Sequence, residues 1–370
     1  MTRWDHESIQ RTEHAVAVVG AGIAGIAVVG SLLDAGMEAG NILWVDPAFA
    51  VGDLGEYWQN VSGNTKVKTL QGFLEASPAF GIEEGELAEL THIGPNQVCD
   101  LGLFVHPLER VTERLREQVH AVAGYVTKLC VEDYRPITIA TRRTDEEGDV
   151  VYGAERAVLA TGSVPRTLEG VPTIPALELR DVLDPTRIAE HIDYGDIIAV
   201  YGSSHSAILA IKNIAEVCAD MGVTIVNFYR SPLRYAFEKG GKIHYDNTGL
   251  KGTVAEWAQR NLGVPESEQK LGIVRVLASE ENIANLAPTC TKAVYAVGLQ
   301  RRAGIGGIAL DNYNTATGEI VEGRVWGIGS GYPERAMDPS GQLEDRVGAA
   351  KFMEHVRKRI VPALVRSLGK

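Results

Sequence analysis

The sequence predicts an α/β fold made of two parallel-sheet domains, the second inserted into the first. The main observation is a repeat: an apolar strand, a turn rich in small residues, a helix and a second strand occur near residue 15 and again near residue 196. Two apolar runs that end in glycine, 157–162 and 293–298, mark the expected entry to and exit from the inserted domain. At 370 residues the chain is long enough for two domains of ordinary size.

The first copy of the repeat carries a Gly-x-Gly-x-x-Gly motif. Gly20, Gly22 and Gly25 directly follow a β-branched strand, 15–19, and precede a helical run that extends to Ala35. In this context the motif is typical of a dinucleotide site. The first glycine permits the tight turn, the second lets the backbone approach a pyrophosphate, and the third lets helix and strand pack closely. The amino end of the helix adds free N–H groups and the positive end of its dipole.

The next strand, 41–45, ends at Asp46. A carboxylate at this position would accept hydrogen bonds from the ribose diol of a bound nucleotide. The alternative is that Asp46 caps the turn before Pro47. Strand, loop, helix and acid together favour the dinucleotide interpretation.

The second copy has a modified loop. Strand 196–201 leads into Gly202-Ser-Ser-His-Ser-Ala207, in which Ser204 and Ala207 replace the second and third glycines, and a helix follows. His205 lies in this loop, and a histidine inside a cofactor loop is more often a positional contact than an acid or base. Because this loop repeats the strand, turn and helix of the first copy, we expect Gly202, Ser204 and Ser206 to bind a second nucleotide.

The second strand of this copy ends with a cation where the first copy has an acid. Arg230 follows the strand 223–228. An arginine can bind a 2′-phosphate, which an aspartate would repel, so NADPH is favoured over NADH. The alternative is that Arg230 is a solvated charge at the end of the strand.

These elements divide the chain into three segments. We expect 1–163 to form the first part of the first dinucleotide-binding domain and 164–290 to form the inserted one. Residues 291–370 would then return to the first domain with a strand and a helix from about 343 to 368. The segment 231–262 is interpreted as an excursion that forms a lid or substrate wall.

Composition excludes several classes. The net charge of −12 argues against nucleic acid or an anionic membrane as partner. The four cysteines are far apart and form no CxxC, which indicates reduced thiols in a cytoplasmic protein and excludes a redox disulfide of that type. No metal-ligand spacing and no Gly-x-Ser-x-Gly elbow occur. The apolar stretch 15–33 is interrupted by a glycine turn, so we interpret it as strand and helix and expect no membrane span.

The order of the motifs resembles the flavoproteins with two dinucleotide-binding domains. The Gly-rich loop and acid are followed by Ala160-Thr161-Gly162, the second loop, and Ala296-Val297-Gly298. This family includes thioredoxin and glutathione reductases and the class B flavin monooxygenases. The resemblance covers nearly the whole chain and implies FAD in the first domain and NADPH in the second. It also implies FAD contacts at Thr161, Gly162 and Gly329, and backbone hydrogen bonds from Val126 to the adenine.

Within that family the sequence looks most like the monooxygenases. It lacks the cysteine pair of the disulfide reductases. The segment 52–58, which ends in Trp58, resembles the Gly-Gly-x-Trp turn that lies beside the flavin in the flavin-containing monooxygenases. By this resemblance Asn64 would lie near the flavin C4a–N5 edge; the alternative is an ordinary turn residue. The second loop resembles that of N-hydroxylating monooxygenases. One departure is that the Phe-x-Gly-x-x-x-His fingerprint of other subgroups is absent between Gly162 and Gly202.

The resemblance implies a single-component monooxygenase in which FAD, reduced by NADPH, transfers one oxygen atom from O2 to a small organic substrate through a C4a-peroxyflavin. One alternative is an NAD(P)H-dependent reductase that passes electrons to an acceptor other than a disulfide. Another is a flavin-binding regulator whose second loop no longer binds NADPH. The sequence does not reveal the substrate, and it leaves the oligomeric state open, a homo-oligomer included.

Overall fold

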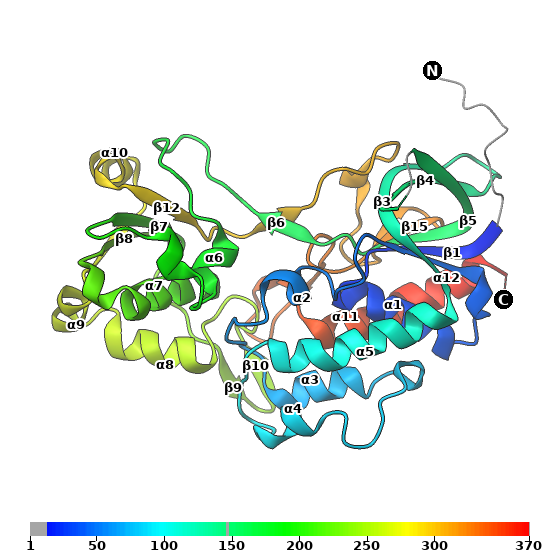
Figure 1. The fold of residues 1–370 in the computed structure, drawn as a ribbon, viewed down its shortest axis with the longest axis horizontal. Coiled ribbons are helices and arrows are strands. Elements are labelled where there is room, and N and C mark those ends of the chain that lie inside the picture. Colours follow the sequence, from blue (N-terminus) through cyan, green and yellow to red (C-terminus); the bar gives the residue numbers. More distant parts are fainter. Residues whose placement is uncertain (1–12, 146–147, 370) are drawn as a thin grey trace.

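The computed structural model describes residues 13–145 and 148–369, which form two α/β domains joined by two crossing segments (Figure 1). Each domain contains the predicted unit of strand, loop, helix and strand. The predicted fold class, two Rossmann-like domains with the second inserted into the first, is therefore confirmed. No helix among the described residues is long and apolar enough to cross a membrane.

The larger domain is built on a seven-stranded sheet with the order β1-β2-β3-β4-β5-β15-β14, in which β1 also pairs with β5. The first residues of β3 and the last residues of β5 pair in parallel with β2 and β1, while their other halves form an antiparallel meander with β4. The strands are β1 (Glu13–Val19), β2 (Ile42–Asp46), β3 (His120–Cys130), β4 (Ile137–Arg143), β5 (Asp149–Leu159), β14 (Glu319–Val321) and β15 (Val325–Gly327).

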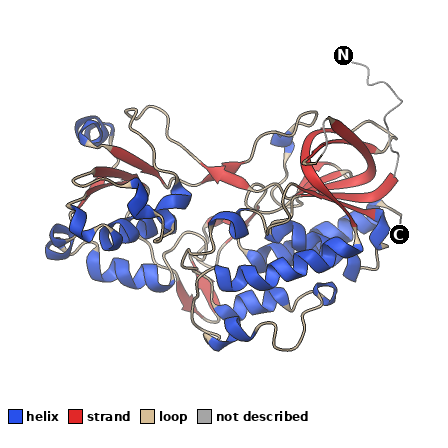
Figure 2. Ribbon diagram, viewed as in Figure 1, coloured by secondary structure: helices blue, strands red, loops and turns tan. Residues whose placement is uncertain are grey.

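Both faces of this sheet are buried. On β1, Val16 and Val18 pack against the helices on one face, and Ala17 and Val19 pack on the other face under the meander. This two-residue alternation explains why the strand is apolar throughout. The helices gather on one side of the sheet (Figure 2). They are α1 (Ile23–Asp34), α2 (Asp53–Tyr57), α3 (Val67–Leu74), α4 (Ala88–His92), α5 (Gly102–Gln118), α11 (Ala349–His355) and α12 (Val361–Ser367), with short 3₁₀ turns at Ala39–Asn41, Pro78–Phe80 and Leu310–Asn312.

The smaller domain has a four-stranded parallel sheet with the order β11-β8-β7-β12. Helix α7 packs Ile208 and Ile211 on one face of it, and Tyr201 and Phe228 lie on the other face. The elements are α6 (Leu179–Leu183), β7 (Ile197–Tyr201), α7 (His205–Val217), β8 (Thr224–Tyr229), α8 (Gly252–Asn261), α9 (Pro265–Lys270), β11 (Ile273–Leu277), α10 (Glu280–Leu286) and β12 (Lys292–Tyr295), with 3₁₀ turns at Ile188–His191, Ala219–Met221 and Ala287–Thr289.

The inserted domain ends later than the sequence suggested. Strand β12 pairs with β7 along its whole length, so the smaller sheet extends beyond residue 290, where we had expected the return to begin. The run 293–298 contributes its first residues to this sheet and then leaves it. The two crossing strands, β6 (Ser163–Pro165) and β13 (Leu299–Arg301), follow directly and pair antiparallel between the domains.

The prediction that the C-terminal helix begins near residue 343 was wrong. Leu343–Arg346 is strand β17, which pairs with β16 (Glu334–Met337). The turn between them is closed by Asp338, whose Oδ1 accepts hydrogen bonds from the backbone of Ser340 and Gln342, both at 2.8 Å. This tertiary hairpin overrides the helical pattern. The helix begins only at Ala349 and continues through a π-helical turn, Val356–Ile360, into α12.

The excursion of the smaller domain is docked on this hairpin. It contains strands β9 (Phe237–Lys239) and β10 (Lys242–His244) and the turn before α8. The buried carboxylate of Glu344 accepts hydrogen bonds from Thr248 Oγ1 at 2.6 Å and from the Asn247 backbone N–H at 3.2 Å. Asp338 Oδ2 accepts one from the Tyr245 backbone at 3.0 Å. The excursion is thus held by carboxylates of the larger domain.

We expect Glu344→Ala to loosen the excursion, because it leaves buried donors without an acceptor, at a cost of about 1–3 kcal/mol. Tryptic cleavage after the exposed Lys239 and Lys242 should then become about tenfold faster or more. Glu322→Ala, at an exposed position, is the matched control and should leave the rate unchanged. Equal cleavage rates in the two variants would show that Glu344 does not hold the segment.

Candidate functional site

The first Gly-rich loop has the geometry that its motif predicts. Gly20 has φ +107°, and a Cβ built on it would lie 2.3 Å from the backbone oxygen of Ala160. A Cβ on Gly25 would lie 1.9 Å from the backbone oxygen of Gly20. Gly22 differs, because the nearest atoms to its Cβ position lie 3.9 Å away, at Val51. Gly20 and Gly25 therefore serve close packing, whereas a Cβ on Gly22 would meet Val51 and Gly52 only at ordinary van der Waals distance.

The second loop repeats this construction. Gly202 has φ +129°, and a Cβ on it would lie 2.4 Å from the backbone oxygen of Ala296. The Gly202 N–H donates to Phe228 O at 2.9 Å, as the Gly20 N–H donates to Val45 O at 2.8 Å. The two loops are therefore fixed in the same way at the carboxyl ends of their sheets.

Both loops lead into helices whose amino ends have no side-chain cap. Gly22, the N-cap of α1, has no side chain to cap the helix, and the side chain of Ser204, the N-cap of α7, accepts no capping hydrogen bond; neither helix has an acid in its first turn. The first N–H groups of such helices lack intrahelical acceptors. Two helices of 12 and 13 residues with uncapped amino ends beside glycine turns suit two diphosphates.

Asp46 lies at the end of β2, as predicted, and its carboxylate is already engaged. Oδ2 accepts a hydrogen bond from the Ala21 backbone at 2.7 Å, and Oδ1 accepts from Ala48 at 2.9 Å and Phe49 at 2.7 Å. The side chain is only 8% exposed. Asp46 thus closes the turn that contains Pro47 and also fixes the Gly-rich loop. Its contact with a ribose remains a prediction.

Several other predicted residues surround the first loop. Gly329 lies against the first turn of α1, since a Cβ on it would be 3.1 Å from Ala24 Cβ. Thr161 and Gly162 follow β5 directly beside the loop, and Gly162 has φ +71°. Val126 lies on β3 beyond its last pairing with β2, at a bulge in the pairing with β4. The structure therefore brings these residues to the carboxyl edge of the larger sheet.

Sequence reasoning missed an ion pair at the same edge. Arg302 Nη2 binds Asp53 at 2.9 Å and 2.7 Å, although the two residues are far apart in the chain. Asp53 Oδ2 lies 3.9 Å from the Cβ position of Gly162. Burial raises the pKa of Asp53, while the charge of Arg302 opposes that change. Arg302 therefore neutralises a carboxylate beside the predicted phosphate loop.

Asn64 and Trp58 lie where the two domains meet. Trp58 packs against the core of the smaller domain. Around Asn64, Ser62 Oγ lies 3.4 Å from Thr253 Oγ1, and Lys66 Nζ lies 3.4 Å from Glu238 Oε2, both in the smaller domain. The half-buried Asn64 accepts one hydrogen bond, from Thr65 Oγ1 at 3.2 Å. This position of Asn64 between the two dinucleotide domains is compatible both with a contact to the flavin edge and with an ordinary turn residue.

In the second loop, Ser204 is exposed and Ser206 half-buried. Neither ring nitrogen of the neighbouring His205 has a hydrogen-bond partner in the described part of the chain. Burial, followed by the charge of Lys251, lowers the pKa of His205 to about 4. The imidazole is therefore neutral at physiological pH, in agreement with a positional contact. Arg230 is exposed at the end of β8 and forms no ion pair with a described residue.

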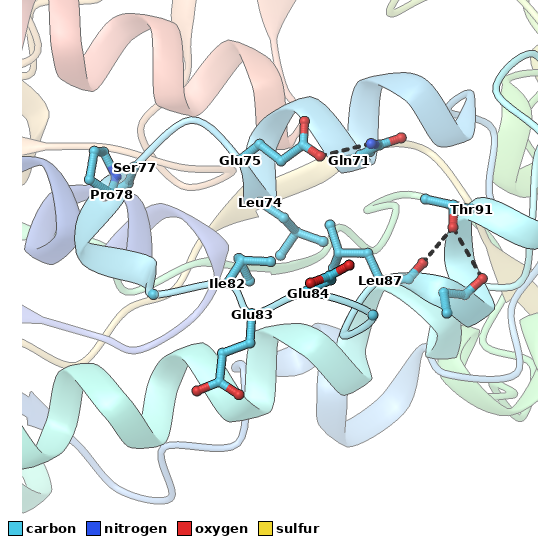
Figure 3. Close-up of a pocket in the computed structure, with 13 residues that line it drawn as sticks. Gln71, Leu74, Glu75, Ser77, Pro78, Ile82, Glu83, Glu84, Leu87 and Thr91 are labelled. Atoms are coloured by element: carbon cyan, nitrogen blue, oxygen red, sulfur yellow. Dashed lines mark hydrogen bonds between the residues drawn. The ribbon is translucent and has the colours of Figure 1, made fainter.

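A separate cavity of about 630 Å³ lies between the end of α3 and α4 (Figure 3). Its lining combines apolar residues such as Leu74 and Leu87 with Glu75, Glu83 and Glu84. It includes none of the predicted cofactor residues. Within 13–145 and 148–369, no three His, Cys, Asp or Glu side chains gather as a metal site.

Comparisons with known proteins agree with this architecture. The chain is 32% identical to the monooxygenase AgnR1 of Paecilomyces divaricatus over 94% of its length and 97% of that protein. The FAD-bound cadaverine monooxygenase DfoA of Erwinia amylovora has a TM-score of 0.68 at 14% identity, with 97% of this chain and 95% of that one covered. The ornithine N-hydroxylase KtzI of Kutzneria sp. 744, with reduced FAD, NADP+ and L-ornithine, has a TM-score of 0.67 at 12% identity, with 96% and 99% covered. No protein-family model matches the chain.

We expect Gly25→Val to abolish binding of the predicted FAD, because the new side chain would collide with the backbone of Gly20. The flavin absorbance of the purified variant, relative to its protein absorbance, measures this. Gly72→Ala in α3 is the control, since its added Cβ meets nothing within 4 Å, and it should retain the flavin. A Gly25→Val protein with a full complement of flavin would contradict the assignment of this loop.

Proposed function

The chain belongs to the same family as the monooxygenase AgnR1, and we propose that it is a class B flavin-dependent monooxygenase whose own residues support the reaction. The enzyme is an oxidoreductase that uses FAD and NADPH. Reduced FAD supplies the oxygen chemistry: it activates O2, and one oxygen atom passes to the substrate. We propose a small organic molecule as that substrate, admitted between the segment 52–66 and the docked excursion.

The observation that carries the proposal is the pair of matching loops. Each has a glycine pressed against a strand end and an uncapped helix amino end behind it. Their strand ends carry opposite charges, Asp46 in one domain and Arg230 in the other. An acid suits a nucleotide whose ribose is free, and a cation suits one that bears a 2′-phosphate. Two similar sites are thus distinguished by charge.

In the larger domain we assign the diphosphate of FAD to the loop at Gly20, Gly22 and Gly25. The absence of a side chain at Gly22 would let the backbone approach the phosphates. Asp46 keeps the loop in place through Ala21 and is the candidate ribose acceptor. We assign the hydrogen bonds to the adenine to the Val126 backbone. The flavin half of the cofactor would extend past Thr161, Gly162 and Gly329, which lie at the same edge.

In the smaller domain we assign NADPH to the loop at Gly202, Ser204 and Ser206. We assign the 2′-phosphate to the exposed Arg230, which forms no ion pair with a described carboxylate. The nicotinamide would then extend towards the junction of the domains. Asn64 and Trp58 lie at this junction. We assign Asn64 a hydrogen bond to the reacting edge of the flavin and Trp58 the exclusion of water from it.

We expect the purified protein to be yellow and NADPH to bleach its flavin anaerobically faster than NADH does. Arg230→Ala should reduce this preference about tenfold, the value of one charge-assisted hydrogen bond of about 1.5 kcal/mol. The measurement is stopped-flow absorbance at increasing nucleotide concentration. Arg260→Ala, an exposed arginine of the same domain, should retain the preference.

The same protein, supplied with air, should consume O2 in a fixed ratio to NADPH when the correct substrate is present. A colourless protein that takes up no FAD would contradict the whole proposal. A yellow protein that NADPH fails to reduce would contradict the assignment of the second domain alone.

We expect Asn64→Ala to release more hydrogen peroxide per NADPH consumed, by about two- to tenfold, because one hydrogen bond of about 0.5–1.5 kcal/mol is lost at the flavin. Peroxide and NADPH are measured in the same assay. Asn96→Ala, an exposed asparagine of the same region, is the control. An unchanged ratio in Asn64→Ala would leave Asn64 as a turn residue.

A further inference from the structure

The smaller sheet contains a buried asparagine that links its loop to an arginine. Asn227 lies in the middle of β8 with no exposed surface. Its Nδ2 donates to Val200 O at 3.0 Å and to Gly202 O at 2.8 Å. Because both contacts of the amide nitrogen are to carbonyls, the amide oxygen faces the other way. It accepts a hydrogen bond from Arg275 Nε at 3.1 Å.

Arg275 is held in a defined orientation by two neighbours. It lies on β11, directly opposite Asn227 in the pairing of β11 with β8. Its guanidinium lies 4.8 Å from the ring centroid of Tyr229, the last residue of β8. The hydrogen bond and the ring fix the plane of the group, and the side chain extends towards the carboxyl end of the sheet. Arg230 is the next residue along the chain.

Arg275 has no counter-ion among the residues that the structure describes. The Arg275 side chain is half-buried, and none of the ion pairs among the described residues includes it. Among the described residues, Arg275 forms a hydrogen bond only through its Nε, so the terminal N–H groups are available to a ligand. A partly buried cation without a counter-ion is costly unless an anion binds there. Its fixed fork suits the oxygens of a phosphate.

We propose that Arg275 is a second arginine for the 2′-phosphate of NADPH and that Asn227 is its positioning residue. This rests on the proposed assignment of NADPH to the smaller domain. The 2′-phosphate is favoured over the diphosphate because Arg275 stacks at the end of β8, where the adenosine ribose of a dinucleotide lies, whereas the diphosphate belongs at the helix amino end. The side chain of Asn227 forms hydrogen bonds with both Arg275 and the backbone oxygen of Gly202, so it connects the two parts of the proposed nucleotide site.

The test compares two fragments on the FAD-loaded enzyme by calorimetry: adenosine 2′,5′-bisphosphate, which carries the 2′-phosphate, and 5′-AMP, which lacks it. Arg275→Met should bind the bisphosphate about 10- to 100-fold more weakly, the range for hydrogen bonds to charged groups. Its affinity for 5′-AMP should change by less than about threefold. Arg275→Lys keeps the charge but loses the fork, so it should fall between the two.

Arg260→Met on α8 is the matched control, since Arg260 is exposed and bonds only to the Glu256 backbone at 3.2 Å. Flavin content and melting temperature report whether each variant is folded. Asn227→Ser tests the positioning role and should also weaken the bisphosphate more than 5′-AMP.

The outcomes separate this inference from the function on which it rests. A wild-type enzyme that binds neither fragment would contradict the assignment of NADPH to this domain. A wild type that prefers the bisphosphate, with Arg275→Met equally selective, would overturn only the role of Arg275. A parallel loss of both fragments would indicate a structural role and would also overturn it.

Discussion

The structure depends on one close contact that occurs twice: a glycine without a side chain lies directly against the backbone carbonyl of a neighbouring strand end. Gly20 meets Ala160 in the larger domain, and Gly202 meets Ala296 in the smaller one. Any Cβ would displace backbone, not a movable side chain. The contact therefore sets the distance between loop and sheet, and with it the direction of the following helix towards a bound phosphate. The third position differs between the two loops: a Cβ on Gly25 would lie 1.9 Å from the backbone oxygen of Gly20, whereas the second loop has Ala207 at this position.

The parts of the fold that the sequence predicted are those fixed by local patterns. The strands of each repeat and both Gly-rich turns follow from runs of a few residues, and the structure places them within one or two residues of expectation. The missed parts depend on distant partners. Nothing near Leu343 indicates that it pairs with Met337 in a hairpin. The pairing of Asp53 with Arg302 likewise needs the return crossing strand to be placed first. The sequence offered one signal of a buried polar contact: Asn227 is an amide residue inside the largely apolar strand β8.

The contacts between the domains combine apolar packing, of Trp58, Val61 and Leu101 against the core of the smaller domain, with polar contacts. Asn60 donates to Asp184 at 3.0 Å, and the buried Glu344 binds the excursion through Thr248. Such contacts are directional, so they set a particular relation between the two nucleotide sites while providing less burial than an apolar interface would. Hydride transfer requires the nicotinamide to meet the flavin at close range. The polar junction around Asn64 is therefore where small changes in domain position would have the largest effect on the reaction.

The charges at the strand ends distinguish the two nucleotide sites, which the matching loops alone would not do. Two sites with the same turn and the same uncapped helix would exchange their nucleotides unless something else distinguished them. In the larger domain Asp46 is buried and fixed by three backbone N–H groups, so its negative charge cannot move away from an approaching 2′-phosphate. In the smaller domain the equivalent strand ends beside Arg230 and Arg275, neither of which is neutralised by a described carboxylate. The chain as a whole is acidic, with a net charge of −12. In the proposed assignment, this local pair of arginines attracts the anionic nucleotide and directs NADPH to the domain that FAD does not occupy.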